Sequence, residues 1–527
     1  MTKAYCGSHT IISPLGFNSG ANYACVESYA TNFSRYAGQT TVGLIDRTQL
    51  NLNGLSDYTF AEQLSIRALS ELIASSGVAL DDAKNLLILS TTKGNIDRLN
   101  SDFDRCFLWA MADRIAGYFS CHNKPLVVSN ACISGVASII MASRFIERGE
   151  YDNVIILGVD VVSEFVVSGF NSFKSISPSV CKPFDASRDG LTLGEACGVL
   201  LLTNNPDLSD SKIFVSGGGL SNDANHISGP SRSGDGLFYA IDEAMKQAGV
   251  SANEIGFINA HGTGTLFNDE MESKAFEMAS LAAAPCNSLK PYFGHTLGAS
   301  GVIETIMCVA QMVDNHVFGV NGYEGNGVPF ELNVSAKHRD VALHHCLKTA
   351  SGFGGTNAAL LLSKEPFSKG KHINPNQGNI VEVAHVVVEP QAGVRFAEYI
   401  RDRYKSLGES NLKFFKMDNL SKLGYVASCL LMKDVCLPFA SNRIGIVLAS
   451  RSGSLDTDMN HQKIVDQHLP EGASPAVFVY TLANVVAAEM AIKHKFQGEL
   501  TVFIREAKDL DFLSDYSQKL IASDLCD

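Results

Sequence analysis

Residues 127–138 read VVSNACISGVAS, which places Cys132 where an apolar strand passes into a helix. Cys is a small apolar side chain that protein cores accept readily, so packing alone would explain it. A helix N-terminus, however, also lowers the pKa of a thiol and makes it a nucleophile. A nucleophilic thiolate needs partner side chains, so the rest of the chain must decide between these two interpretations.

Around this stretch, short apolar runs alternate with helical patterns up to about residue 365. Runs that are apolar on both faces predict strands, and the helical patterns between them predict helices that cover a sheet on each side. We therefore expect an α/β fold with a largely parallel sheet. The predicted strands lie at 85–92, 153–163, 196–203, 212–219 and 254–262, and two clear helices lie at 235–250 and 301–315.

The composition narrows the class of protein. The chain has 527 residues, long enough for two or three domains, and a net charge of −13, which disfavours nucleic acid or an anionic membrane as the main partner. No secretory signal and no run of about 18 apolar residues is visible, so no membrane span is expected. The 13 cysteines are an odd number without a C-x-x-C pair, which disfavours a disulfide framework and a zinc site. A cytoplasmic enzyme is the expectation.

The composition changes after residue 365. Residues 366–380 are polar, contain Pro and Gly, and predict a linker between a domain at 1–365 and an α/β region at 381–527. Within that region we expect strands and helices in turn. The predicted strands are 381–390 and 443–450, and the predicted helices are 393–407 and 475–494.

This C-terminal region echoes the first domain in two places. LSTTKGNID (89–97) resembles LASRSGSLD (448–456), and FLWAMADRIAG (107–117) resembles FVYTLANVVAA (478–488) at nearly the same offset. The matches suggest a truncated repeat that lacks a nucleophile. They can also arise by chance, because α/β units share patterning.

Two of the 14 histidines stand in settings like that of Cys132. His261 lies in NAHGTGT after a predicted strand, and His295 lies in KPYFGHTLGASG before an apolar helix. Gly, Thr and Ser around them let a substrate approach the backbone. Phe353 lies in SGFGGTN, where glycines expose backbone N–H groups of the kind that form oxyanion holes. Taken alone, that segment would be a plain glycine turn.

Taken together, these segments resemble the β-ketoacyl-acyl-carrier-protein synthases, the elongating Cys-His-His class of the thiolase-like superfamily. The resemblance covers about the first 365 residues, with five motifs in the family's order. It implies an αβαβα layered fold of two similar halves, followed by the extra C-terminal α/β region. The motifs are NACISG, KPFDASRDGLTLGEACGVLLL (182–202), NAHGTGTLFNDEME (259–272), KPYFGHTLGASGVIE (290–304) and SGFGGTN (351–357).

The resemblance implies a decarboxylative Claisen condensation in fatty-acid or polyketide/polyene-type lipid biosynthesis. Cys132 would take an acyl group, and malonyl on an acyl carrier protein would lose CO2 and attack it, giving a 3-oxoacyl thioester two carbons longer. His261 and His295 would donate N–H groups to the enolate. The backbone N–H groups of Cys132 and Phe353 would hold the oxyanion, and Phe353 would gate the site.

Four further residues receive roles from the same resemblance. Lys290 would support the histidines electrostatically, and Glu304 would lie in the shell behind the site. Thr263 and Thr265 would contact the pantetheine arm of the substrate. Without the resemblance, Lys290 would be interpreted as a solvated lysine, and the two threonines would be interpreted as ordinary turn residues.

No cofactor and no metal is implied, because the substrates are carried on the phosphopantetheine of acyl carrier protein. That protein is the expected partner, together with a homodimer and a possible further synthase-like subunit bound through 381–527. Thr349-Ala350-Ser351 replaces the family's usual Asn-Ser-Phe, and the segment before Cys132 is short. In the family, that segment helps to form the pocket and the dimer contact. A synthase-like partner or scaffold subunit, or a non-decarboxylative acyltransferase, remains an alternative.

Overall fold

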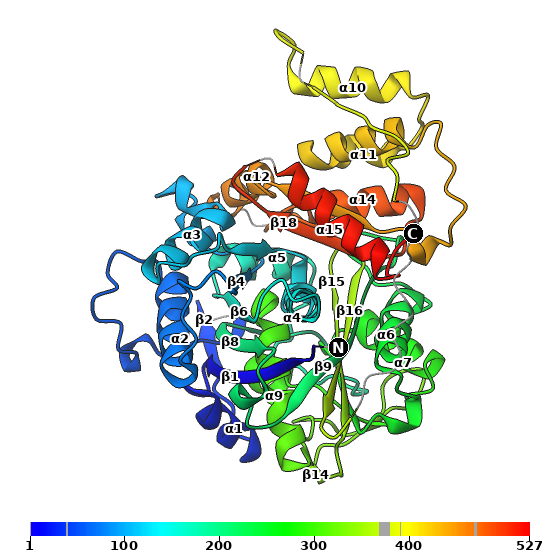
Figure 1. Ribbon diagram of the computed structural model, residues 1–527. Helices are drawn as coiled ribbons and strands as arrows, with labels where there is room; N and C mark the ends of the chain where they lie inside the picture. Colours follow the sequence, from blue (N-terminus) through cyan, green and yellow to red (C-terminus); the bar gives the residue numbers. More distant parts are fainter. Residues whose placement is uncertain (1, 38–39, 368–379, 390, 468–471, 508) are drawn as a thin grey trace.

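Two halves with the same strand pattern form most of the first 365 residues. A computed structural model describes residues 2–37, 40–367, 380–389, 391–467, 472–507 and 509–527 (Figure 1). The strands of the first half are β1 (Ala4–Ile12), β8 (Ala196–Thr203), β6 (Asn153–Asp160), β4 (Asn85–Ser90) and β5 (Leu126–Val128), in sheet order. Those of the second half are β9 (Ile213–Asn222), β16 (Thr356–Lys364), β15 (His345–Gly352), β10 (Phe257–Asn259), β11 (Pro285–Asn287) and β13 (Asn333–Val334).

The prediction of a largely parallel sheet is wrong for the strands of each half that lie nearest the other half. The pairs β4–β5 and β4–β6 are parallel, but β6–β8 and β8–β1 are antiparallel. The second half repeats this order, with β10 parallel to β11 and β15, and β16 antiparallel to β15 and β9. Periodicity could not reveal this, because a buried strand is apolar on both faces in either direction. The two similar halves implied by the resemblance are present.

Helices fill the layers between and outside the two half-sheets. α4 (Ser134–Glu147) and α9 (Ser300–Asp314) lie between them and contact strands of both, while α2 (Phe60–Ser76) and α3 (Leu108–Tyr118) cover the first half. α6 (Asp235–Ala248) packs on the outer face of the second half, with α7 (Leu266–Met278) beside it. This gives the expected αβαβα layering. The remaining elements of this part are α1 (Ser19–Glu27), α5 (Glu164–Ser172), α8 (Lys290–Phe293), β2 (Ser34–Tyr36), β3 (Thr40–Gly43), β7 (Leu193–Gly194), β12 (His316–Val317) and β14 (Arg339–Asp340).

The two central helices are apolar all round because a sheet covers each side of them. Nearly every residue of α4 and α9 is buried. The stretch Leu297–Asp314 is therefore long and apolar enough to pass a membrane-span test, but 83% of it is buried inside the protein, as in a core helix. The helices cross in direct contact at Gly135 and Gly301, where a Cβ atom would come within 2.7 and 2.4 Å of the facing backbone. Only glycine permits this approach.

The C-terminal region continues the sheet of the first half. β18 (Leu500–Ile504) pairs antiparallel with β5, and β17 (Ile446–Ser450) pairs parallel with β18, so the local sheet order is β4-β5-β18-β17. The element order β17, α14 (Val485–His494), β18, α15 (Leu510–Ala522) repeats β4, α3, β5, α4. β5 and β18 are thus related by a local pseudo-two-fold axis, and the region has the element order of a partial copy.

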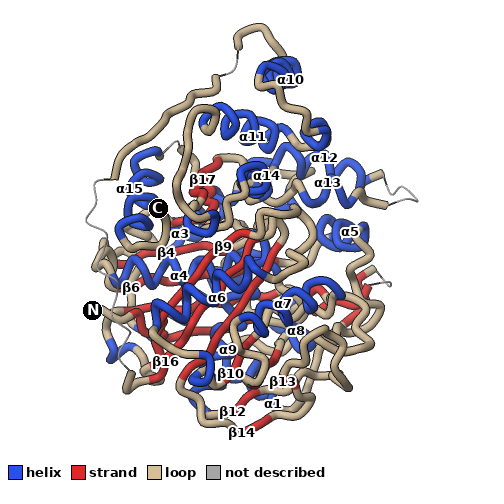
Figure 2. The backbone as a smooth tube through the Cα atoms, turned by 90° about the vertical axis from the view of Figure 1, so that its right-hand side faces the viewer, coloured by secondary structure: helices blue, strands red, loops and turns tan. Residues whose placement is uncertain are grey.

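Several predictions for the C-terminal region need correction. Residues 381–389 of the predicted strand are not a strand, and Val381, Val383 and Val387 on them are exposed. The predicted helix 475–494 is two helices, α13 (Pro475–Val479) and α14, with a turn between them. Residues 368–379 of the predicted linker lie outside the described residues. The other helices here are α10 (Phe396–Ser406), α11 (Asn419–Leu431) and α12 (Leu455–Asp466); α10 and α11 lie at the far end of the molecule from β14 (Figures 1 and 2).

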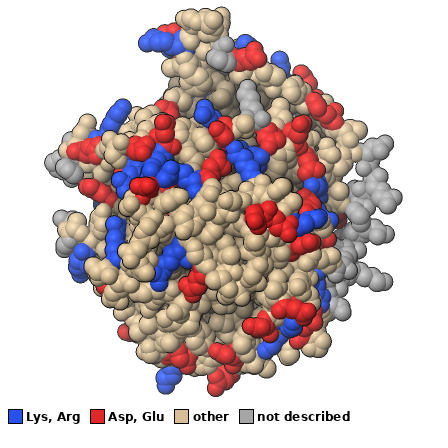
Figure 3. All heavy atoms as spheres, turned by 60° about the vertical axis from the view of Figure 1, so that its left-hand side comes forward, with Lys and Arg blue, Asp and Glu red and all other residues tan. Residues whose placement is uncertain are grey.

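Buried polar contacts tie the C-terminal region to the first 365 residues. Lys93 forms an ion pair with Asp458 at 2.9 Å, and Arg144 forms one with Glu499 at 2.8 Å, all four side chains being less than 10% exposed. These contacts lie beneath the surface, which carries acidic and basic side chains in mixture (Figure 3). The region is therefore packed as part of the same folded unit.

Candidate active site

The nucleophile candidate lies at a tight turn between β5 and α4. Ala131 has a φ of +49°, in the left-handed region, and Cys132 follows it at the start of the helix. The turn is held by Ser134, whose hydroxyl accepts the N–H of Asn130 at 2.8 Å. Asn130 in turn donates to the carbonyl of Leu500 and accepts the N–H of Val502, each at 2.8 Å. The strand β18 therefore helps to fix the turn that presents Cys132.

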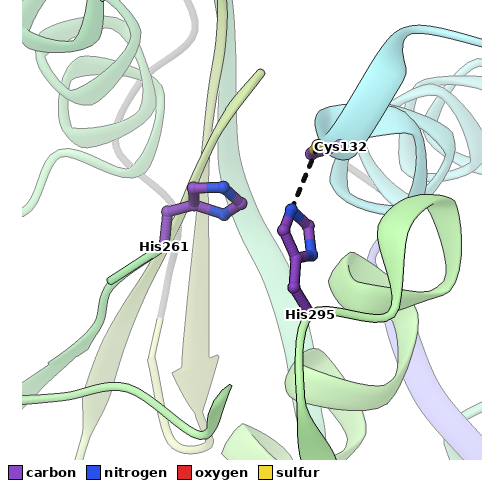
Figure 4. Close-up of side chains that lie close together, drawn as sticks. All are labelled: Cys132, His261 and His295. Carbon is purple, nitrogen blue, oxygen red and sulfur yellow. Dashed lines mark hydrogen bonds between the residues drawn. The ribbon is translucent and has the colours of Figure 1, made fainter. Parts of the chain in front are cut away.

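His295 faces Cys132 from the corresponding turn before α9. Its Nε2 lies 3.1 Å from the Cys132 Sγ (Figure 4). Its Nδ1 receives the backbone N–H of Leu297 at 3.3 Å. A backbone N–H can only donate, so Nδ1 is the acceptor and the neutral ring carries its proton on Nε2. His295 therefore presents an N–H towards the sulfur.

His261 completes the cluster from the loop between β10 and α7. The ring centroids of His261 and His295 lie 5.1 Å apart, at an interplanar angle of 83°. One ring nitrogen of each histidine and the Cys132 Sγ all lie within 4.8 Å of one another. The carboxylate of Glu272 holds the loop by accepting the N–H groups of His261 and Gly262, at 2.8 and 2.7 Å. The Lys290 Nζ lies 3.4 Å from the His261 Nδ1, which again leaves the proton on Nε2.

A buried charge cluster lies directly behind the histidines. Lys290 Nζ forms an ion pair with Glu304 at 2.9 Å and also donates to the carbonyl of His261. A second lysine, Lys348 on β15, approaches the other oxygen of Glu304 to 2.5 Å. Lys348 is fully buried, and it was not predicted from the sequence as a site residue. A lysine within the buried strand 345–352 is itself unusual and could have served as a signal. Lys290 is likewise fully buried, so the solvated interpretation does not hold.

Burial dominates the electrostatics of the cluster. It lowers the pKa of His261 and His295 well below the usual value, and the positive charge of Lys290 acts in the same direction, so both rings are neutral at pH 7. Burial raises the pKa of the Cys132 thiol to about 12, against the lowering effect of Lys290. The helix position suggested the opposite direction for this thiol. Loss of hydration outweighs it, because Cys132 is only 8% exposed.

The same three side chains have the composition of a zinc site, but their surroundings do not fit one. Metal-bound histidines donate their second ring N–H to a carbonyl or carboxylate. Here the Nδ1 of His295 accepts from Leu297 and that of His261 lies beside the ammonium of Lys290. The nitrogens that face Cys132 therefore carry protons and offer no lone pair to a metal. The cluster is suited to donating hydrogen bonds.

A cavity of about 300 Å³ leads to the cluster. Thr263 and Thr265 lie in its wall and share a hydrogen bond between their hydroxyls at 2.8 Å. Phe353 also lines it, and its ring packs against Phe170 and Phe173 of the α5 segment, with centroids at 6.0 and 5.3 Å. Phe353 therefore has two aromatic neighbours in space, although no aromatic residue stands next to it in the sequence.

Two protein-family models match the chain. The model of the β-ketoacyl synthase N-terminal domain matches residues 61–207, and the model of the β-ketoacyl synthase C-terminal domain matches residues 213–321. The chain is 33% identical over 258 residues to 3-oxoacyl-[acyl-carrier-protein] synthase 2 of Vibrio cholerae, covering 45% of this chain and 62% of that protein. It is 32% identical over 268 residues to a putative polyketide β-ketoacyl synthase 1 of Streptomyces cyaneus, covering 48% and 64%. The chain thus spans about three fifths of the length of these relatives.

Two solved structures are similar to this fold, one over part of the chain and one over all of it. The ketosynthase ApeO, solved in complex with its chain length factor ApeC from Xenorhabdus doucetiae, is 27% identical with a TM-score of 0.63 and covers 69% of this chain and 98% of that chain. The PfaC keto synthase-chain length factor has a TM-score of 0.78 at 15% identity and covers 100% of this chain and 73% of that chain. At that identity the second likeness shows the fold alone, and this fold includes the C-terminal region.

Proposed function

We propose that this chain, whose residues 61–207 and 213–321 match the two β-ketoacyl synthase domains, catalyses decarboxylative Claisen condensation on acyl carrier protein. The observation that carries the proposal is the convergence of the Cys132 thiol with His261 and His295, each of which presents an N–H group. Such a set provides one nucleophile and two donors to a developing oxyanion, at the end of a mostly apolar cavity whose wall includes Thr263 and Thr265.

In the first half-reaction, Cys132 attacks the carbonyl carbon of an acyl thioester. The sulfur–carbon bond to the enzyme forms, the bond to pantetheine sulfur breaks, and the thiol proton passes to the leaving thiolate. His295 stabilises the thiolate that forms on the way, since its Nε2–H points at the sulfur from 3.1 Å. The N–H groups of Cys132 and Phe353 would hold the tetrahedral oxyanion.

In the second half-reaction, malonyl on acyl carrier protein loses its carboxylate as CO2 and leaves an enolate. His261 and His295 donate hydrogen bonds to the enolate oxygen, and its carbon attacks the acyl-cysteine carbonyl. The carbon–sulfur bond to Cys132 breaks and the thiolate takes up a proton. The product is the 3-oxoacyl thioester, two carbons longer than the acyl group that entered.

The partners follow from this chemistry. Acyl carrier protein delivers both substrates, and Thr263 and Thr265 would contact its pantetheine arm. The implied homodimer uses the segment before Cys132, but here β5 of that segment already pairs with β18. We therefore propose that the C-terminal region takes the place of a second copy at this edge, and that any further synthase-like subunit binds elsewhere. All 13 cysteines carry free thiols, which supports a cytoplasmic location.

Two measurements test the function. Intact-protein mass spectrometry after incubation with acyl-carrier thioesters should show one acyl group on the wild type and none on Cys132→Ala. Release of labelled CO2 from malonyl carrier should then require both histidines, and formation of the 3-oxoacyl product should require Cys132 as well. Acyl loading without CO2 release would favour the non-decarboxylative acyltransferase, and a chain that never loads would favour the scaffold subunit.

A further inference from the structure

The oxyanion loop, Gly352–Gly355, is held between the nucleophile and the C-terminal region. On one side, a Cβ atom at Gly352 would lie 3.1 Å from the backbone nitrogen of Cys132. On the other side, the Asn484 side chain reaches the loop from the N-terminal end of α14. Its Nδ2 donates to the carbonyl oxygen of Phe353 at 2.8 Å. A side chain 131 positions along the chain therefore contacts the residue that would supply an oxyanion donor.

The Asn484 side chain makes no hydrogen bond within its own helix. An Asn at a helix N-terminus normally caps its own helix with its side-chain oxygen. Asn484 is fully buried, makes no such capping bond, and its Oδ1 has no hydrogen-bond partner among the described residues. A carbonyl can only accept, so the amide nitrogen must face Phe353. The Asn484 side chain therefore binds the loop and does not cap its own helix.

The loop leaves space for that amide. Gly354 has a φ of +87°, and a Cβ atom there would lie 2.5 Å from the Asn484 Nδ2. The peptide unit between Phe353 and Gly354 is then fixed at both ends, since the Gly354 N–H donates to the carbonyl of Ile227. Among the described residues, the only other donor to the Phe353 carbonyl is the Thr356 hydroxyl, at 3.5 Å. Asn484 is therefore the stronger donor to this carbonyl.

The pseudo-repeat gives an internal comparison. In the match of 107–117 with 478–488, the position of Asn484 is occupied by Asp113 in the first half. Asp113 is half-buried and lies 3.7 Å from the exposed Lys124. Among the described residues, Asp113 makes no contact with any counterpart of the loop Gly352–Gly355. The amide donor therefore occurs only in the copy that faces an active site.

We propose that Asn484 is a positioning residue of the active site, through which the C-terminal region holds the oxyanion loop in its catalytic geometry. This proposal rests on the proposed function. Removing one oxyanion donor typically lowers the reaction rate by about 10²–10³-fold, and displacing a donor should lower the rate by a smaller factor. We expect Asn484→Leu, which keeps the size but has no donor, to slow acylation of Cys132 by about ten- to a hundredfold.

The test compares two reactions of the same sulfur in the full-length protein. Acylation by octanoyl-N-acetylcysteamine forms a tetrahedral oxyanion, whereas alkylation by iodoacetamide is a direct displacement and forms none. Asn484→Leu should slow the first and leave the second within about twofold of wild type. Val486→Ala, a truncation at a buried position of the same helix, serves as the control and should change neither rate by more than its effect on folding.

Asn484→Asp gives a second readout that a purely structural role would not produce. A carboxylate cannot donate to the Phe353 carbonyl, but a protonated carboxyl can, so the acylation rate relative to wild type should rise as the pH is lowered. Equal acylation rates in Asn484→Leu and wild type, or equal losses in acylation and alkylation, would overturn the proposal. If the wild type itself is not acylated, the proposed function fails first and the inference falls with it.

Discussion

Val128 of β5 pairs antiparallel with Phe503 of β18, and this pairing makes the C-terminal region part of the sheet that leads to Cys132. Because strands of one sheet share their core, we expect the two parts to unfold in one transition. In a urea titration, fluorescence of the single tryptophan, Trp109, would report the first part and a label on the exposed Cys436 would report the second. The two curves should coincide, and two separated midpoints would contradict this.

The buried ion pair between Arg144 on α4 and Glu499 before β18 should be sensitive to the loss of one partner. Arg144→Met would leave the Glu499 carboxylate buried with only neutral donors, so we expect a loss of about 3–5 kcal/mol in the free energy of unfolding. The exposed pair Lys246–Asp242 provides the control, since Lys246→Met should cost no more than about 1 kcal/mol. Denaturant unfolding measures both. A loss at Arg144 no larger than the control would show that the pair contributes little.

Gly169 on α5 should not tolerate alanine. Alanine normally stabilises a helix by about 1 kcal/mol relative to glycine. A Cβ atom at Gly169, however, would lie 2.1 Å from the ring of Phe478 in the C-terminal region, so Gly169→Ala should lower the melting temperature. Gly117→Ala on α3, where nothing lies within 4 Å of the new atom, should leave it unchanged or raise it. The same shift in both variants would argue against the Phe478 contact.

The reactivity of Cys132 should depend steeply on pH. With a pKa of about 12, the thiolate fraction below that value rises about tenfold for each pH unit. We expect the iodoacetamide rate at Cys132, followed by peptide mass spectrometry with Cys132→Ser as the blank, to keep rising from pH 7 to pH 10. A plateau below pH 9 would mean that Lys290 and the helix N-terminus outweigh burial.

Lys348 should influence the two histidines from behind. Its positive charge helps to lower the pKa of His261 and His295, so Lys348→Met should raise the pKa of both rings. Titration of the imidazoles by nitrogen NMR would show the upward shift, and the acid limb of the activity profile should move to higher pH with it. Lys364→Met, on the neighbouring strand β16 and partly exposed, should leave both unchanged. No shift in Lys348→Met would contradict the electrostatic role.

Much of the site could be predicted from the sequence because its residues occur in unusual local settings. Cys132, His261 and His295 each follow a strand and are surrounded by small residues, which is visible without a structure. The repeat of Ser-Gly-Val at 134–136 and 300–302, where α4 and α9 cross, was also available as a signal of two similar halves. Lys348 and Asn484 were missed, because their roles depend on contacts with residues more than 40 positions away.

The sequence alone was enough to single out Cys132, His261 and His295 and to predict the α/β class, since these depend on residue type and local periodicity. The layered arrangement of two similar halves was implied by the resemblance to the β-ketoacyl synthases. Only the tertiary structure decided the antiparallel strands in each half, the protonated nitrogens of both rings and the place of the C-terminal region beside β5. Strand direction and ring tautomer are set by hydrogen bonds between distant segments, and no local pattern records which segments meet.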